Sequence, residues 1–225
     1  LTKANAEKAK IAEAKVLRAF FYYLLMDAWG NVPFYTENTV TIENLPQSSR
    51  AEIFDFVVKE LNENIELLSP NKGGQYYGRF NKWAGYALLA KVYLNAEVYT
   101  GTAKWTECIA ACNKVSVGAS SLHPGAANAS SPLGFQYFEL FGDELPADET
   151  ILAIYTKVDV VGRNIFTIRS FHGPHANALF GVSGWNGTVT HRDYVERFDD
   201  NDIRKRQFVW GAQEGGVNYS MDISS

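Results

Sequence analysis

The sequence predicts a mainly α-helical fold, in which pairs of helices form a superhelix and a loop-rich elaboration with short strands follows. Three observations predict it. Apolar residues recur at helical spacing through the first half, Gly or Pro closes each of these runs, and a stretch rich in Gly, Ala, Ser and Pro begins near Gly118. We expect a helical-repeat scaffold over residues 1–117. A ligand-binding elaboration over residues 118–225 would pack on it, in one structural domain truncated at both ends.

Composition narrows the class of protein. The 225 residues are 46% hydrophobic and 14% aromatic, which is ample material for a core. The net charge of -4 argues against nucleic acid as the partner, since nucleic-acid binding calls for basic patches.

The first helix is predicted around the stretch "FFYYLLMDAWGNVPFY". Its uninterrupted apolar run, from Ala19 to Met26, is too short for a membrane span, which needs about 20 apolar residues. Gly30 ends the helix and Pro33 follows. The helical rhythm predicts a wide buried face, made of Val16, Leu17, Phe20, Phe21, Leu24, Leu25 and Ala28.

A second helix begins at a candidate capping box formed by Ser49 and Glu52, and Pro70 ends its pattern. A third begins after Asn81, a good N-cap residue, and runs to Gly101. Its expected buried faces contain Trp83, Tyr86, Ala87, Leu89, Ala90, Tyr93 and Leu94.

A fourth helix, "TAKWTECIAACNKV", carries Cys108 and Cys112 on one face, where they are interpreted as two small buried residues. The aromatic and small residues from Trp83 to Ala90 resemble a tetratricopeptide repeat. Because one such repeat cannot bury its face alone, we expect further repeats outside this chain.

The second half alternates loops with short elements. A β-like run covers Ile151 to Val158, and a helix is predicted from Thr190 to Phe198. An acidic turn and a short helix or strand follow. Loops on a rigid scaffold usually carry function, so the ligand site is expected in this half.

Four segments, in order, resemble SusD/RagB-like outer-membrane nutrient-binding lipoproteins. "EAKVLRAFFYYLLMDAWGNVPF" fits the family pattern E-x-x-x-L-R-A-x-x-Y-x-x-L followed by G-x-V-P, and "GRFNKWAGYALLAKVYL" fits its next repeat. "DETILAIYTK" and "SGWNGTVTHRDYVERFDDNDIRKR" fit the family's later segments. Family members run to about twice this length, so the signal peptide, lipid-bearing Cys and C-terminal repeats are expected to be missing.

The resemblance implies a function and a location. Such proteins bind glycans or other nutrients at the cell surface, cap a TonB-dependent β-barrel transporter of the SusC type, and are not enzymes. A lipid on an N-terminal segment would attach the protein to the outer membrane. The resemblance implies no cofactor and no nucleic-acid partner.

Trp185 and Asn186, in "GVSGWNGT", are the first candidate ligand-binding residues. Sugar C–H faces are apolar and stack on aromatic rings, while an amide can bond to hydroxyls. For Trp185 two interpretations stay open, a ligand platform and a loop anchor.

Further candidates lie upstream, in "GRNIF" and "RSFHGPHANALF". Arg163 and Asn164 could bond to hydroxyls and Phe166 could stack. Starch-binding relatives would have an aromatic residue directly after Arg-Asn, and Ile165 stands there instead, which argues against starch itself. An alternative role for Arg163 is a surface ion pair.

His172 and His175 are predicted to be sugar contacts or ordinary loop histidines. A zinc site would need a third ligand, for which only His191 is nearby, so no metal is expected. "FDDNDIRKR" lacks the Gly and Glu of an EF-hand and predicts an acidic turn with local pairing of Asp202 and Arg204.

Two other functions compete with glycan capture. A helical-repeat scaffold that binds a protein partner fits the helix pairs. A glycoside hydrolase needs paired carboxylates at a defined separation. The carboxylates available here, on Asp143, Glu144, Asp148 and Glu149, look like loop charges.

Overall fold

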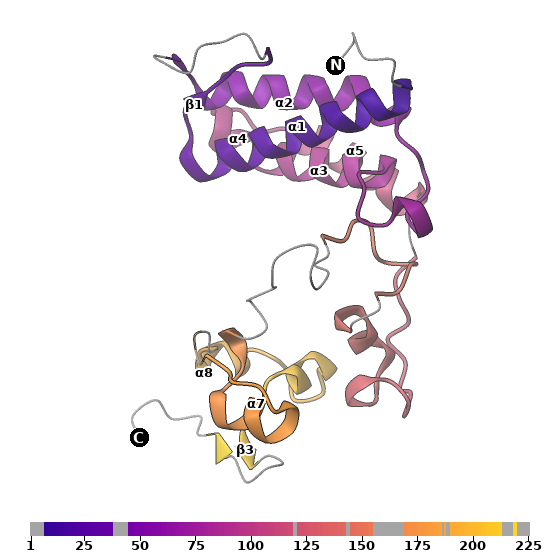
Figure 1. Cartoon of the computed structure of the whole chain (residues 1–225), viewed down its shortest axis with the longest axis vertical. Coiled ribbons are helices and arrows are strands. Elements are labelled where there is room, and N and C mark those ends of the chain that lie inside the picture. The colour runs from indigo at the N-terminus through magenta and orange to yellow at the C-terminus, as the bar shows by residue number, and fades with distance from the viewer. Residues whose placement is uncertain are drawn as a thin grey trace. The chain divides into compact units, whose positions relative to one another are not determined.

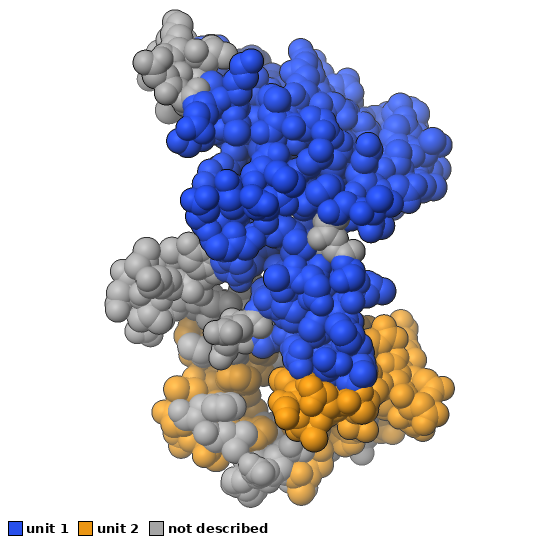
Figure 2. Space-filling model, turned by 90° about the vertical axis from the view of Figure 1, so that its right-hand side faces the viewer, with its two compact units in different colours: residues 1–126, 136–154 blue, residues 127–135, 155–225 orange. Residues whose placement is uncertain are grey.

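The computed structural model describes residues 7–37, 45–118, 121–142, 145–154, 169–185, 187, 190–212 and 218–219. Contacts group the chain into two compact units (Figure 2). Unit 1 contains residues 1–126 and 136–154, and unit 2 contains residues 127–135 and 155–225. The division at residue 117 that the sequence suggests stays a prediction.

Unit 1 is a stack of helices. Its elements are α1 (Lys8–Trp29), β1 (Val32–Pro33), β2 (Gln47–Ser48), α2 (Arg50–Asn64), η1 (Ile65–Leu67), η2 (Gly74–Tyr76), α3 (Lys82–Leu94), α4 (Ala96–Thr100), α5 (Trp105–Gly118) and η4 (Gln136–Phe141). The predicted mainly helical fold is confirmed. The predicted third helix is divided, because α3 ends at Leu94 and α4 continues after Asn95.

Side chains at the helix ends explain where α2 and α3 begin. Ser49 N donates to Glu52 Oε2 at 2.7 Å and Glu52 N donates to Ser49 Oγ at 3.3 Å, which confirms the capping box. Asn81 Oδ1 accepts from the backbone N–H groups of Trp83 and Ala84, both at 3.0 Å. At the end of α4, Gly101 adopts the left-handed conformation with φ of 77°.

The core of unit 1 lies between two helix pairs. Helix α1 packs beside α2, α3 packs beside α5, and the short antiparallel pair of β1 and β2 closes one end (Figure 1). The largest fully buried side chains are Met26, Ile53, Leu61, Ile65, Val16, Val57, Val92 and Asn81. Among the described helices, none is both long and apolar enough to cross a membrane.

The predicted buried face of α1 was partly wrong. Leu17, Phe21, Leu24 and Leu25 have exposed fractions of 38–53%, and Trp29 further along is also exposed. The buried residues of α1 are Ala12, Val16, Ala19, Tyr22 and Met26. The reason is that α2 and the segment after α1 contact one side of the helix, while apolar residues occupy both sides. We call the exposed residues Leu17, Phe21, Leu24, Leu25 and Trp29 the outer stripe of α1.

Two smaller predictions of burial were also wrong. Leu94 is 54% exposed because α3 ends there, and Cys112 is exposed. Helix α5 turns a narrow face toward α3, and that face contains Ala111 together with the half-buried Cys108, whose Sγ donates to Ala90 O at 3.4 Å.

Polar contacts hold the inner side of α1. Arg18 Nε and Nη2 both donate to Glu60 Oε2, at 3.1 and 2.6 Å, and Tyr22 Oη donates to Tyr35 O at 2.8 Å. The half-buried Arg18 thus ties α1 to α2 through the carboxylate of Glu60.

The expected strand at 151–158 is not seen where the structure describes it. Residues 151–154 form no strand, and residues 155–158 lie outside the described residues. Ile151 O accepts instead from Asn81 Nδ2 at 2.9 Å, so a side chain of α3's N-cap takes the place of a neighbouring strand.

Unit 2 contains small elements: η3 (Pro132–Gly134), α7 (Gly173–Phe180), α8 (Arg192–Val195), η5 (Ile203–Gln207), β3 (Gly211–Ala212) and β4 (Asn218–Tyr219). Helix α8 is shorter than the predicted helix from Thr190 to Phe198. The rings of Tyr194, Phe198 and Phe208 pack together with centroids 5.4–5.9 Å apart. The predicted local pairing of Asp202 and Arg204 is confirmed, with a 2.5 Å contact between Oδ2 and Nη2.

Candidate functional site

The described part of the predicted site lies around α7. Three of the predicted site residues, Trp185, His172 and His175, fall within the described residues 169–185 of unit 2. The other four, Asn186, Arg163, Asn164 and Phe166, lie outside the described residues.

Helix α7 has clear boundaries in the sequence. His172 is the N-cap residue and Pro174 lies in the first turn, where its missing N–H costs no helical hydrogen bond. At the other end Gly181 is left-handed, with φ of 63°, and its N–H donates to Asn177 O at 3.0 Å. The chain therefore reverses direction and returns along the start of α7.

The returning loop is held at two glycines that flank Trp185. A Cβ on Gly184 would lie 2.3 Å from Phe171 O, so no other residue fits there without a backbone shift. Gly187 N donates to Arg169 O at 2.7 Å. Residues 169–171 thus contact the loop on both sides of Trp185.

The Trp185 side chain itself remains open to solvent, with an exposed fraction of 55%. A residue whose ring served chiefly to anchor the loop would be expected to bury that ring. His172 and His175 are both half-buried. We call Trp185, His172 and His175 the α7 platform. Within the described residues, no three His, Cys, Asp or Glu side chains come together in a way that could hold a metal ion.

Unit 1 contains a charged cluster that no motif in the sequence indicates. His123 Nε2 lies 2.8 Å from Glu139 Oε2, and its Nδ1 lies 3.0 Å from Asp148 Oδ2. The backbone N–H of His123 donates to Glu149 Oε2 at 2.8 Å, and Lys72 Nζ donates to Asp148 O at 3.2 Å. No spacing rule signals this cluster, because its members come from four separate segments of the sequence, one of them η4.

The cluster changes the acidity of its members. Hydrogen bonds to Asp148 and Glu139 raise the pKa of His123 above its ordinary value of 6.5. The hydrogen bond from His123 in turn lowers the pKa of Asp148 below its ordinary value of 3.8. A protonated imidazole can donate to both carboxylates at once, whereas a neutral one can donate to only one.

We therefore expect stability to depend on pH through His123. Since the folded pKa is raised, the contribution is fully present below pH 6.5 and is lost as pH rises through the folded pKa. The contribution of Asp148, whose pKa is lowered, is present above pH 3.8 and is lost as pH falls through the folded value. Urea unfolding at pH 6 and pH 9 should show His123→Gln less stable than wild type at pH 6, with a smaller difference at pH 9.

The exposed His191 provides the control for this prediction. His191→Gln should leave the free energy of unfolding unchanged at both pH values. An equal loss for His123→Gln at pH 6 and pH 9 would contradict the ionic account and indicate a packing role instead.

Taken together, these observations first define a class: a helical-repeat protein of the tetratricopeptide-like type, with a loop-rich unit that carries an exposed aromatic side chain. Residues 2–94 match a family model described as "Starch-binding associating with outer membrane", SusD-like. The helical part of the chain is therefore similar to the SusD-like family.

Curated relatives support the same likeness, and each matches less than half of this chain. A "SusD-like protein" of Bacteroides ovatus is 34% identical over 94 residues, which are 40% of this chain and 17% of the relative. The "Starch-binding protein SusD" of Bacteroides thetaiotaomicron is 32% identical over 107 residues, which are 46% of this chain and 18% of the relative. The matched stretches therefore span less than a fifth of the length of each of these relatives.

A solved structure extends the likeness of fold beyond the helices. A SusD-like protein from Bacteroides fragilis superposes with a TM-score of 0.68 and 23% identity, covering 87% of this chain and 37% of the other. At that identity the likeness concerns the fold alone.

Proposed function

We propose that the protein binds a glycan or related nutrient at the cell surface and delivers it to a TonB-dependent transporter of the SusC type. The proposal rests on the exposed indole of Trp185, in a loop whose position is fixed by backbone contacts of Gly184 and Gly187. The description of the matching family as starch-binding supports the same class of ligand.

The chemistry of the α7 platform suits a sugar. An indole face offers an apolar surface to the C–H side of a pyranose ring, and the half-buried imidazoles of His172 and His175 can bond to hydroxyls. Asn186, Arg163, Asn164 and Phe166 are proposed to complete the site, on the sequence argument given above.

Replacing Trp185 by Ala is expected to weaken glycan binding by about 1–3 kcal/mol, because an exposed ring that stacks on a ligand contributes as an interface hot spot. Calorimetry on the variant with a panel of polysaccharides would measure the loss. Trp105, at the start of α5, is a matched control because its exposed fraction of 50% is similar and it lies in unit 1. Weakening by Trp105→Ala alone would remove Trp185 from the site.

Binding without catalysis is proposed for the same site. A glycoside hydrolase needs two carboxylates on either side of the glycosidic bond. The Asp148 carboxylate bonds to the imidazole of His123, and the Glu149 carboxylate accepts from the backbone N–H of His123. Both contacts suit a structural role. Release of reducing sugar from a polysaccharide by the purified protein would contradict this proposal.

A protein-binding scaffold is the second candidate, and the outer stripe of α1 favours it. Large exposed apolar surfaces on soluble proteins often mark contacts with other proteins. A peptide or protein that binds the helices equally well with and without Trp185, in a chain that binds no glycan, would favour this alternative.

The proposed location is the outer membrane, at the cell surface. The family description associates such proteins with the outer membrane. We propose that a lipid on a preceding N-terminal segment anchors the protein there, which fractionation of cells that produce the full-length protein would test.

A further inference from the structure

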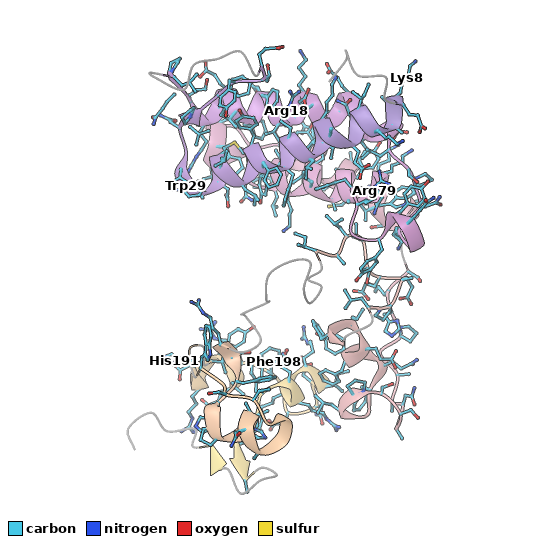
Figure 3. The ribbon with its side chains drawn as sticks, viewed as in Figure 1. Lys8, Arg18, Trp29, Arg79, His191 and Phe198 are labelled. Carbon is cyan, nitrogen blue, oxygen red and sulfur yellow. The ribbon has the colours of Figure 1, made fainter. Side chains whose placement is uncertain are left out.

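A small cavity opens in unit 1, at the end of the helices where α1 begins. Its volume is about 210 Å³, and its walls come from the first turns of α1, from η1 and from the segment around η2. The residues that matter for its chemistry are Lys10, Glu13, Leu67, Ser69, Tyr76 and Arg79. Arg79 and Lys8 mark this end of the helices in Figure 3, and Trp29 marks the opposite end of α1.

One wall of the cavity is a fixed polar fork. Arg79 Nε donates to Glu13 Oε1 at 3.0 Å, and Nη2 donates to Glu13 Oε2. The guanidinium carbon also lies 5.8 Å from the centroid of the Tyr76 ring. The hydrogen bonds to Glu13 raise the pKa of Arg79, so its charge is secure. These contacts hold both side chains in place before any ligand arrives.

The fork keeps hydrogen-bonding capacity. A guanidinium has five N–H groups, and Glu13 takes two of those on Arg79. A carboxylate offers about four lone-pair sites, so Glu13 can accept further bonds. Two neighbouring hydroxyls of one ligand could therefore bind here together. One would donate to the Glu13 carboxylate and the other would accept from the Arg79 guanidinium.

Charge and size narrow the ligand further. The side chains of Glu7 and Lys10, one turn apart at the start of α1, form an ion pair at 3.7 Å, and Glu13 with Arg79 form another, so the charges that line the cavity are balanced. An anion such as phosphate gains little from a balanced site. A volume of about 210 Å³ is smaller than the usual pockets for drug-sized ligands, which points to a single ring.

The remaining wall is apolar and accessible. Leu67 is 47% exposed, and the Tyr76 ring lies under the guanidinium. An apolar surface next to the polar fork is complementary to a pyranose, which has an apolar C–H face and polar hydroxyls. We propose that this cavity is a second carbohydrate contact, which takes one neutral sugar residue of a longer glycan whose main contact is elsewhere on the protein.

The inference rests on the proposed function and deepens it by adding a second site. It is tested on the whole 225-residue chain by two-dimensional NMR, with glucose, a hexasaccharide of α-1,4-linked glucose and a hexasaccharide of β-1,3-linked glucose as probes. Glucuronate is included as an anionic probe. We expect the neutral sugars to shift the backbone resonances of Glu13, Ser69 and Tyr76, and glucuronate to shift them no more than glucose does.

Tyr76→Ala is expected to weaken the sugar affinity that these shifts report about threefold to tenfold, which is the change that loss of one aromatic stacking contact produces. Tyr77→Ala is the matched control, because Tyr77 is the next residue, is exposed, and does not line the cavity. Leu67→Ala is a second test variant, in case Tyr76→Ala alters the fold seen by circular dichroism.

The outcomes separate the two proposals. If the resonances of the α7 platform shift with a sugar while those around Tyr76 do not, the second site is overturned and the proposed function stands. If no sugar shifts either set, both are overturned. Equal effects of Tyr76→Ala and Tyr77→Ala, or stronger shifts with glucuronate than with glucose, would also overturn the cavity as a neutral-sugar contact.

Discussion

Replacing Arg18 by Leu is expected to lower the free energy of unfolding by about 3–5 kcal/mol. The guanidinium donates two hydrogen bonds to Glu60 Oε2, and the side chain of Glu60 has an exposed fraction of only 9%. Without Arg18 that carboxylate would stay buried with no counter-charge, which is among the most costly changes a core can suffer. Urea unfolding followed by circular dichroism would measure the loss.

Two further variants make this prediction sharp. Arg79→Leu breaks a similar bidentate pair with Glu13, but there the arginine side chain is 43% exposed, so we expect a loss of about 1 kcal/mol or less. The double variant Arg18→Met with Glu60→Leu should recover most of the stability, because apolar residues can replace both charges of a buried pair. A double variant as unstable as Arg18→Leu would show that packing around Arg18, and not the orphaned charge, dominates.

Replacing Met26 by Ala is expected to cost about 2–5 kcal/mol, because Met26 is fully buried between α1 and its neighbours and its loss leaves a cavity. Its neighbour Leu25, on the outer stripe of α1, gives the matched comparison. Leu25→Ala should cost less than about 1 kcal/mol, since the side chain is already 38% exposed.

Thermal or urea unfolding of the two single variants decides the matter. The sequence alone predicts the reverse order, because Leu25 was assigned to the buried face and Met26 was not. If Leu25→Ala proved the more destabilising variant, the orientation of α1 in the structure would be wrong.

The fold was predictable wherever the information is local. The capping box of Ser49 and Glu52, the N-cap at Asn81 and the closing glycine at 101 each act within a few residues, so the starts of α2 and α3 and the end of α4 follow from the sequence. The division between α3 and α4, and the absence of a strand at 151–154, could not be predicted in this way. At Ile151 a contact between residues far apart is responsible, because Ile151 O accepts from Asn81 Nδ2.

The candidate site was predictable only in part. The sequence left two interpretations of Trp185 open, a ligand platform and a loop anchor, and in the structure its ring is exposed beside the close backbone approach at Gly184. The role of Trp185 in ligand binding stays a prediction. The charged cluster at His123 and the cavity beside Tyr76 could not be predicted, because each gathers side chains from segments that only the folded chain brings together.

The two-sided apolar character of α1 has a consequence for how uniquely the protein folds. Hydrophobicity alone gives α1 two nearly equivalent ways to lie, rotated about its own axis. What distinguishes them is polar: Arg18 meets Glu60, Tyr22 bonds to the backbone of Tyr35, and Asp27 accepts from Tyr99 at 2.6 Å. Apolar burial therefore sets how tightly α1 is held, and these three contacts set its rotational register, much as single polar residues fix the alignment of coiled coils.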